Sequence, residues 1–157
     1  MNALATLAAL PAAPLLLAAP EEPAAVARQV FAAAKAAFCP ILLAHGIARV
    51  VIAYDGSGDE GQVHDVLAFN AADEAVDLPN VSCERVTSGY RGEITIDMAT
   101  LGNALDNFAY EALAAFHGGW EDNDGSCGEI TIDTAEQSAT LDHNWRITAF
   151  DSSSEEI

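Results

Sequence analysis

Acidic side chains and glycines are concentrated in two short stretches, each next to an apolar run. The first stretch is YDGSGDEGQ, residues 54–62, and the second is GGWEDNDGSCGE, residues 118–129. Carboxylate oxygens bind hard divalent cations, and a cluster of them also attracts cationic protein surfaces. If both stretches lie at one end of a sheet, seven carboxylates converge: Asp55, Asp59, Glu60, Glu121, Asp122, Asp124 and Glu129.

A divalent-metal site is one interpretation of these stretches, and a divalent cation is then the expected cofactor. The first stretch is not an EF-hand, because a loop starting at Asp55 has Glu60 at the glycine position and Val66 at the bidentate glutamate position. The second is not one either, because anchoring it on Gly125 puts Trp120 at position 1 and Thr131 at position 12. A metal-assisted hydrolase would use the same two loops. A plain solvated turn has the same composition, since Asp, Asn and Gly start turns. The candidate metal ligands are Asp55, Asp59, Asp122, Asp124 and Glu129.

The net charge favours a different interpretation, the binding of a basic protein. The chain has a formal charge of −18, and residues 50–157 contain 22 acidic side chains against Arg85, Arg91 and Arg146. Such a field repels nucleic acids and anionic membranes, so we expect neither as a direct partner, and it attracts basic protein surfaces. Trp120, between two glycines and a run of acids, would be exposed and would anchor the partner. The candidate binding surface consists of Asp55, Asp59, Glu60, Trp120, Glu121, Asp122 and Asp124.

Motifs for catalysis are not evident in the sequence. Residues 56–58, GSG, match neither phosphate-binding glycine pattern, and Ser57 is not in a G-x-S-x-G elbow. The histidines are scattered and form no H-E-x-x-H motif: His45, His64, His117 and His143. Two carboxylates can work as an acid and base pair only through unequal burial, which a sequence does not reveal. We identify no catalytic residue, and a non-enzymatic role is favoured.

Cysteine usage and the N-terminus predict a cytoplasmic protein. Cys39, Cys83 and Cys127 are widely spaced, include no C-x-x-C, and suit a reducing compartment. Residues 1–25 have the apolar centre of a signal peptide but lack its basic start, and Pro11 and Pro14 interrupt the centre, so secretion is less favoured. No uninterrupted apolar run reaches the ~20 residues of a membrane span.

The chain divides into three parts around one expected domain. Residues 1–20 are a low-complexity Ala/Leu/Pro segment, residues 21–150 form a single domain, and residues 151–157 are an acidic tail. Residues 21–38 fit a helix that Pro40 ends or kinks. IARVVIAY, residues 47–54, predicts a central strand, and VHDVLAFN, residues 63–70, predicts its antiparallel partner, with the first acidic stretch as the hairpin connection.

The second half contains an internal echo. GEITIDMA, residues 92–99, and GEITIDTA, residues 128–135, share seven of eight residues, and we interpret them as two similar strands rather than a repeat architecture. VSCERVT, residues 81–87, is a weaker strand candidate. Asp97 would cap a helix whose apolar face runs from Met98 to Phe116.

The last predicted element completes the fold class. TLDHNWRITAF, residues 140–150, alternates Leu141, His143, Trp145 and Ile147 on one side, with Trp145 in the core. The order of elements predicts an α+β domain, a mainly antiparallel sheet with two principal helices packed on one face.

The two acidic stretches, separated by a helix and followed by the LDHNWR strand of residues 141–146, resemble an uncharacterised family of small acidic proteins of bacterial plasmids and phages. The likeness covers roughly residues 47–150. It implies a mobile-element context, in which acidic proteins that imitate DNA and block nucleases are a known theme, and it supplies no catalytic residue.

Three functional hypotheses follow from the sequence. The first is a non-enzymatic acidic domain that binds a basic protein surface, as a DNA-mimic-like inhibitor of a basic nucleic-acid-binding protein. The alternative is a divalent-metal-binding protein or metal-assisted hydrolase that uses the two loops. The third is an accessory domain whose loops are simply solvated.

Overall fold

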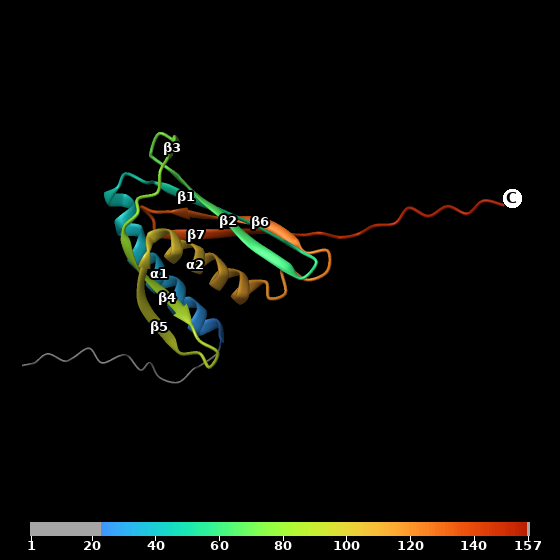
Figure 1. The fold of residues 1–157 in the computed structure, drawn as a ribbon, viewed down its shortest axis with the longest axis horizontal. Helices are drawn as coiled ribbons and strands as arrows, with labels where there is room; N and C mark the ends of the chain where they lie inside the picture. The colour runs from blue at the N-terminus through green and yellow to red at the C-terminus, as the bar shows by residue number, and fades with distance from the viewer. Residues whose placement is uncertain (1–22, 157) are drawn as a thin grey trace, which may run out of the picture.

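The computed structural model describes residues 23–156, which form two helices and seven strands in two sheets (Figure 1). The five-stranded sheet has the order β3-β2-β1-β6-β7, and the second sheet is the β4-β5 hairpin. The expected segment of residues 1–20 lies outside the described residues. Along the chain the elements are α1 (Pro23–Ala44), β1 (Arg49–Ser57), β2 (Glu60–Phe69), β3 (Ala75–Val76), β4 (Ser82–Ser88), β5 (Ile94–Thr100), α2 (Leu101–Phe116), β6 (Ser126–Asp133) and β7 (Ser138–Trp145).

The central strand β1 fixes the two faces of the large sheet. It pairs antiparallel with β2 on one side and with β6 on the other. Val50, Ile52 and Tyr54 alternate on the buried face, as the period of two along a strand requires. Figure 1 shows α1 and α2 together on one side of this sheet. The predicted α+β class, a mainly antiparallel sheet with two helices, is confirmed.

Helix α1 continues through Pro40 to Ala44, so of the two effects predicted for this proline, an end or a kink, the end is wrong. Proline removes the hydrogen bond to the carbonyl four residues earlier, but Ala36 is exposed and water can reach that carbonyl. Cys39 and Leu42, on either side of Pro40, are fully buried and hold the helix in the core. The segment Ala24–Ala44 is also long and apolar enough to cross a membrane, a test that a buried core helix passes as well.

The junction of β5 and α2 differs from the sequence prediction. The N-cap of α2 is Thr100, whose hydroxyl accepts a hydrogen bond from Asn103 N at 3.1 Å. Asp97, the predicted cap, lies in β5 and pairs with Arg85 of β4, and Met98 is exposed on the same strand. The β4-β5 ladder continues as far as the pair Ser82 and Thr100, so the helix begins only after this pairing ends.

The two echoed segments are both strands, as expected, but they have different surroundings. Ile132 in β6 is fully buried between neighbouring strands and the helices, whereas Ile96, at the equivalent position in β5, is exposed. Strand β4, the weaker candidate, packs against both helices on the side away from the large sheet (Figure 1). The helices therefore lie between two sheets, which the sequence did not indicate.

Candidate functional site

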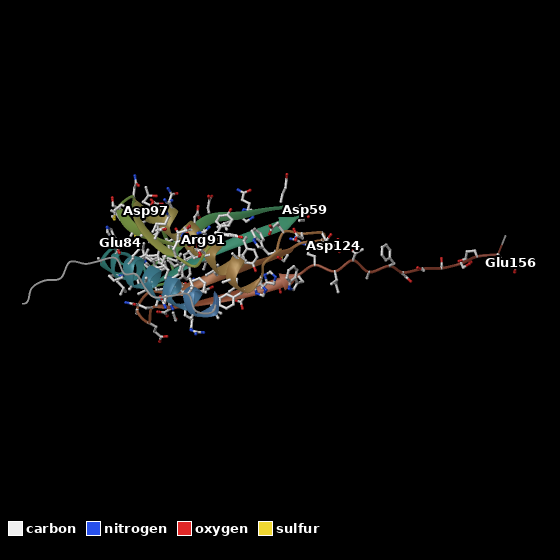
Figure 2. The ribbon with its side chains drawn as sticks, turned by 90° about the horizontal axis from the view of Figure 1, so that it is seen from below. Asp59, Glu84, Arg91, Asp97, Asp124 and Glu156 are labelled. Carbon is white, nitrogen blue, oxygen red and sulfur yellow. The ribbon has the colours of Figure 1, made fainter. Side chains whose placement is uncertain are left out.

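The two acidic loops lie at the same end of the large sheet and contact each other directly. Gly58 N donates a hydrogen bond to Asn123 O, and Asp59 N donates one to Glu121 O, both at 2.9 Å. Figure 2 shows Asp59 and Asp124 near each other at the end of the folded body from which the C-terminal segment leaves. The juxtaposition on which both main hypotheses depend is therefore present.

Backbone geometry explains why glycines accompany the acids. Ser57 pairs with Glu60, so the β1-β2 connection is a two-residue turn, and Gly58 and Asp59 have φ values of 61° and 65°. Gly and Asp are favoured in such turns because they tolerate positive φ. Gly58 therefore serves to form a tight hairpin turn.

The acidic side chains have separate partners and form no common ligand set. Arg146 Nη2 donates to both carboxylate oxygens of Asp55, at 3.0 and 2.9 Å. Asp59 Oδ1 accepts from Asn123 N at 3.4 Å, and Asp124 accepts from the Thr148 hydroxyl.

The remaining acids do not complete a metal site. Glu60 and Asp122 are exposed, and Glu129 lies on the exposed face of β6 beside Asp142 of β7. Glu121 Oε2 is buried and has no hydrogen-bond partner in the structure. Within residues 23–156, no three His, Cys, Asp or Glu side chains are placed to hold a metal ion. The metal interpretation receives no support from this geometry.

The surroundings of the two tryptophans are the reverse of those predicted. Trp120 is only 7% exposed. Its ring lies under the β1-β2 hairpin, where a Cβ on Gly56 would come within 2.8 Å of Trp120 Cζ3, and it meets the Tyr54 ring edge-on at 5.5 Å. Trp145, predicted to be in the core, is 53% exposed because β7 is the edge strand of the sheet. Trp120 therefore supports the acidic loops from below and is not a surface anchor.

An aromatic and histidine cluster, formed by Tyr54, His117, His143 and Trp145, lies beside Trp120. The Tyr54 hydroxyl and His143 Nδ1 are hydrogen-bonded at 2.5 Å, and the rings of His117 and His143 stack with centroids 3.6 Å apart. The Trp145 ring meets His143 edge-on at 4.7 Å. The sequence did not reveal this cluster, because His117 follows a helix and His143 lies in an edge strand. The alternation of residues 141–145 did place His143 correctly on the inner face.

A family model matches most of the chain. The model of a family of unknown function (DUF6878) matches residues 30–157. The chain belongs to this family. The match begins inside α1, earlier than the predicted likeness from residue 47, so most of the first helix is part of the family's common unit. No curated protein and no solved structure matches the chain.

Burial shifts the pKa values of two side chains in the aromatic and histidine cluster. Burial, together with the nearby Cys127 and Asp142, raises the pKa of Tyr54 to about 12. Burial and the adjacent His117 lower the pKa of His143 below its ordinary value. The lowered pKa of His143 favours its neutral imidazole, which is hydrogen-bonded to the Tyr54 hydroxyl through Nδ1.

The lowered pKa of His143 predicts a loss of stability in mild acid. Below the ordinary histidine pKa of 6.5, the unfolded chain binds a proton more readily than the folded chain does, so the free energy of unfolding falls as the pH falls. We expect a smaller slope between pH 7 and 5 in His143→Gln, by up to ~1.4 kcal/mol per pH unit for one full proton. His64→Gln, at an exposed strand position, is the matched control. Urea unfolding at each pH measures the slopes, and equal slopes in both variants would contradict the assignment.

Proposed function

We propose that this protein binds a basic protein surface through its acidic end, without catalysing a reaction. The acidic end consists of Asp55, Asp59, Glu60, Glu121, Asp122 and Asp124. The observation that carries the proposal is the direct hydrogen bonding between its two loops, which holds these acids together on tight turns. Like charges held in place by the fold create a local negative field that steers a cationic partner.

The other acids add a general field rather than a second docking point. Glu84 and Asp97 lie toward the opposite end of the molecule (Figure 2), and Asp97 is neutralised by Arg85. Asp73 pairs with Arg49 in the same way. At the acidic end, Asp55 pairs with Arg146.

A finer form of the proposal is a DNA-mimic-like inhibitor of a basic nucleic-acid-binding protein. Its supports are the mobile-element context implied by the resemblance and the fixing of the acidic turns by backbone hydrogen bonds. Pre-organised anions lose less conformational entropy on binding than mobile ones do. A cytoplasmic location fits the three cysteines, which are free in the structure, two of them buried. The metal alternative lacks a comparable observation.

Binding to purified basic DNA-binding proteins tests the proposal. The affinity of the wild-type protein should fall steeply between about 0.05 and 0.5 M salt, because the interaction is electrostatic. The variant Glu60→Gln/Asp122→Asn/Asp124→Asn should bind at least about tenfold more weakly at low salt, a loss of ~1.4 kcal/mol.

A second triple variant serves as the control. Asp77→Asn/Glu84→Gln/Glu136→Gln removes the same charge from exposed positions elsewhere. It should lose less than about threefold, because only the general field weakens. An equal loss in both variants would mean that net charge alone acts, and salt-independent binding would contradict the proposal altogether.

A further inference from the structure

Strand β7 is an open edge of the large sheet. It pairs with β6 on one side, and none of the other strands in residues 23–156 lies on its outer side. In an antiparallel ladder alternate residues turn their N–H and C=O groups outward, so an edge strand presents unpaired groups to a partner. The β6-β7 register runs without a bulge from Ser126–Trp145 to Asp133–Ser138, and β7 contains no proline. The usual devices that protect an edge are therefore weak here.

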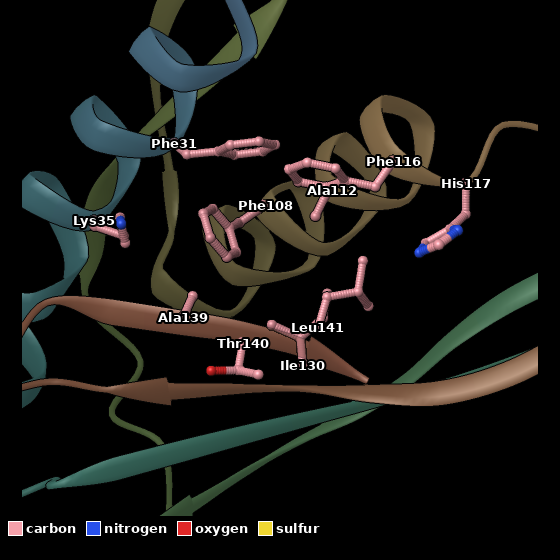
Figure 3. A pocket seen from close by; sticks show the side chains of 10 residues that line it. All are labelled: Phe31, Lys35, Phe108, Ala112, Phe116, His117, Ile130, Ala139, Thr140 and Leu141. Atoms are coloured by element: carbon pink, nitrogen blue, oxygen red, sulfur yellow. The ribbon is translucent and has the colours of Figure 1, made fainter. Parts of the chain in front are cut away.

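A mostly apolar groove, which Lys35 and His117 also line, runs along the inner face of β7. A cavity of about 520 Å³ lies between the helices and the sheet at this strand. Figure 3 shows Phe31, Phe108 and Phe116 on the helix side of the cavity, facing Ala139 and Leu141 on the sheet side. Phe116 is 64% exposed, although the helical period of α2 places it on the same side as the buried Ala112 and Leu113. This groove and the open edge are adjacent parts of one surface.

The outer face of β7 has the opposite character. Asp142 points to that face, and its partner across the β6 ladder is Glu129, which is also exposed. The strand then leads directly into the acidic end, where Arg146 N donates to Gly125 O and Thr148 contacts Asp124. A strand added to β7 would therefore have apolar surroundings on one face and acidic surroundings on the other.

We infer that β7 binds an extended segment of a basic partner as a sixth strand of the sheet. Alternate apolar side chains of that segment fill the groove, and the intervening lysine or arginine side chains lie beside Asp142 and Glu129. Main-chain hydrogen bonds supply affinity and the two faces supply specificity, as in other cases of strand addition. This inference rests on the proposed function, because it identifies which part of a basic partner is recognised.

Charge favours such a partner over a second copy of this chain. A second copy carries the same net charge of −18 and would bring its own Asp142 to the shared edge. Like charges at neighbouring cross-strand positions are destabilising. A segment that alternates valine or leucine with lysine has neither difficulty.

A labelled synthetic peptide tests the inference. The probe is eight residues long, the length of β7, with alternating valine and lysine. Its control has the same composition with the valines and lysines in two blocks. By fluorescence anisotropy the alternating peptide should bind at least about tenfold more tightly than the block peptide, because only the alternating order separates apolar from basic side chains in a strand.

Protein variants locate the binding edge. Leu141→Lys introduces a charge into the groove and should weaken binding of the alternating peptide at least about tenfold. Ala139→Lys is exposed at the same face and serves as a second variant if Leu141→Lys unfolds. Leu67→Lys is the control, since Leu67 is 52% exposed on the opposite face of the sheet. It should leave binding unchanged.

The possible outcomes separate this inference from the proposed function. Equal binding of both peptides, or no effect of either groove variant, would overturn the strand addition and leave the acidic-end proposal standing. A dimer that Leu141→Lys dissociates would also overturn it, because a second copy would then occupy the edge. If the purified basic proteins fail to bind as well, the proposed function falls independently.

Discussion

Replacing Trp120 with alanine should lower the free energy of unfolding by about 3–5 kcal/mol, the usual cost of deleting a buried aromatic side chain. The ring fills the space beneath Gly56 and packs edge-on against Tyr54, so its loss leaves a cavity under the acidic hairpin. The Trp120 carbonyl also accepts a hydrogen bond from the buried Ser126 hydroxyl at 2.7 Å, and this segment would move with it.

Trp145→Ala is the matched control for this prediction. It removes the same side chain from a position that is 53% exposed, so we expect a loss below about 1 kcal/mol, as for most surface substitutions. Urea unfolding followed by circular dichroism gives both values without relying on tryptophan fluorescence. A small loss for Trp120→Ala, comparable with that of Trp145→Ala, would mean that Trp120 is a surface residue after all.

The reversed surroundings of the two tryptophans show where sequence reasoning fails. Trp120 follows two glycines and precedes three acids among the next four residues, which is typical of an exposed loop. What buries it is a hairpin more than 50 residues earlier, in which Gly56 and Gly61 have no side chains and leave room for the ring. Such non-local complementarity has no periodic signal, although two glycines at paired positions of a hairpin are a usable hint.

Trp145 illustrates a different limit. The alternation of Leu141, His143 and Trp145 correctly gave the inner face of the strand. It did not show that the strand lies at the edge of the sheet, where Trp145 remains 53% exposed. Periodicity indicates a face, whereas sheet order decides whether another layer covers that face. The same limit hid the groove beside β7.

The elements themselves were largely predictable, because their signals are local. The β-branched run of β1 and the glycine-containing turn after it predicted the first hairpin, and the structure confirms that pairing. The start of α2 was placed too early, because Asp97 is an equally good cap by residue type and only the β4 register excludes it.

The arrangement of the acidic loops was predictable only in part. Their composition predicted a concentration of charge, and the pairing of β1 with both β2 and β6 brings them to one end. Composition did not predict where each carboxylate points. Two residues that follow β7 contact these carboxylates separately: Arg146 pairs with Asp55, and Thr148 donates to Asp124. The carboxylates therefore do not come together as the ligand set that the sequence allowed.

Gly125→Ala should be among the most destabilising single substitutions in this protein, with a fall in the free energy of unfolding of about 2–5 kcal/mol. Gly125 has φ +76°, which costs an alanine about 1–2 kcal/mol, and a Cβ there would also lie 2.6 Å from the carbonyl carbon of Gly56. That contact is with backbone, so relief requires the two acidic loops to separate, at the cost typical of an overpacked site, about 1–3 kcal/mol.

Gly46→Ala isolates the steric part of this prediction. Gly46 has nearly the same φ, +75°, but a Cβ added there meets nothing within 4 Å. Gly46→Ala should therefore lower the free energy of unfolding only by the backbone cost of about 1–2 kcal/mol. The difference between the two variants in urea unfolding measures how tightly the loops pack.

Because the acidic end exists only while the loops are in contact, Gly125→Ala should also weaken binding to basic proteins under conditions in which it remains folded, and Gly46→Ala should not. Equal losses of stability would show that the loops do not pack against each other, and the acidic end would then have no fixed arrangement to offer a partner.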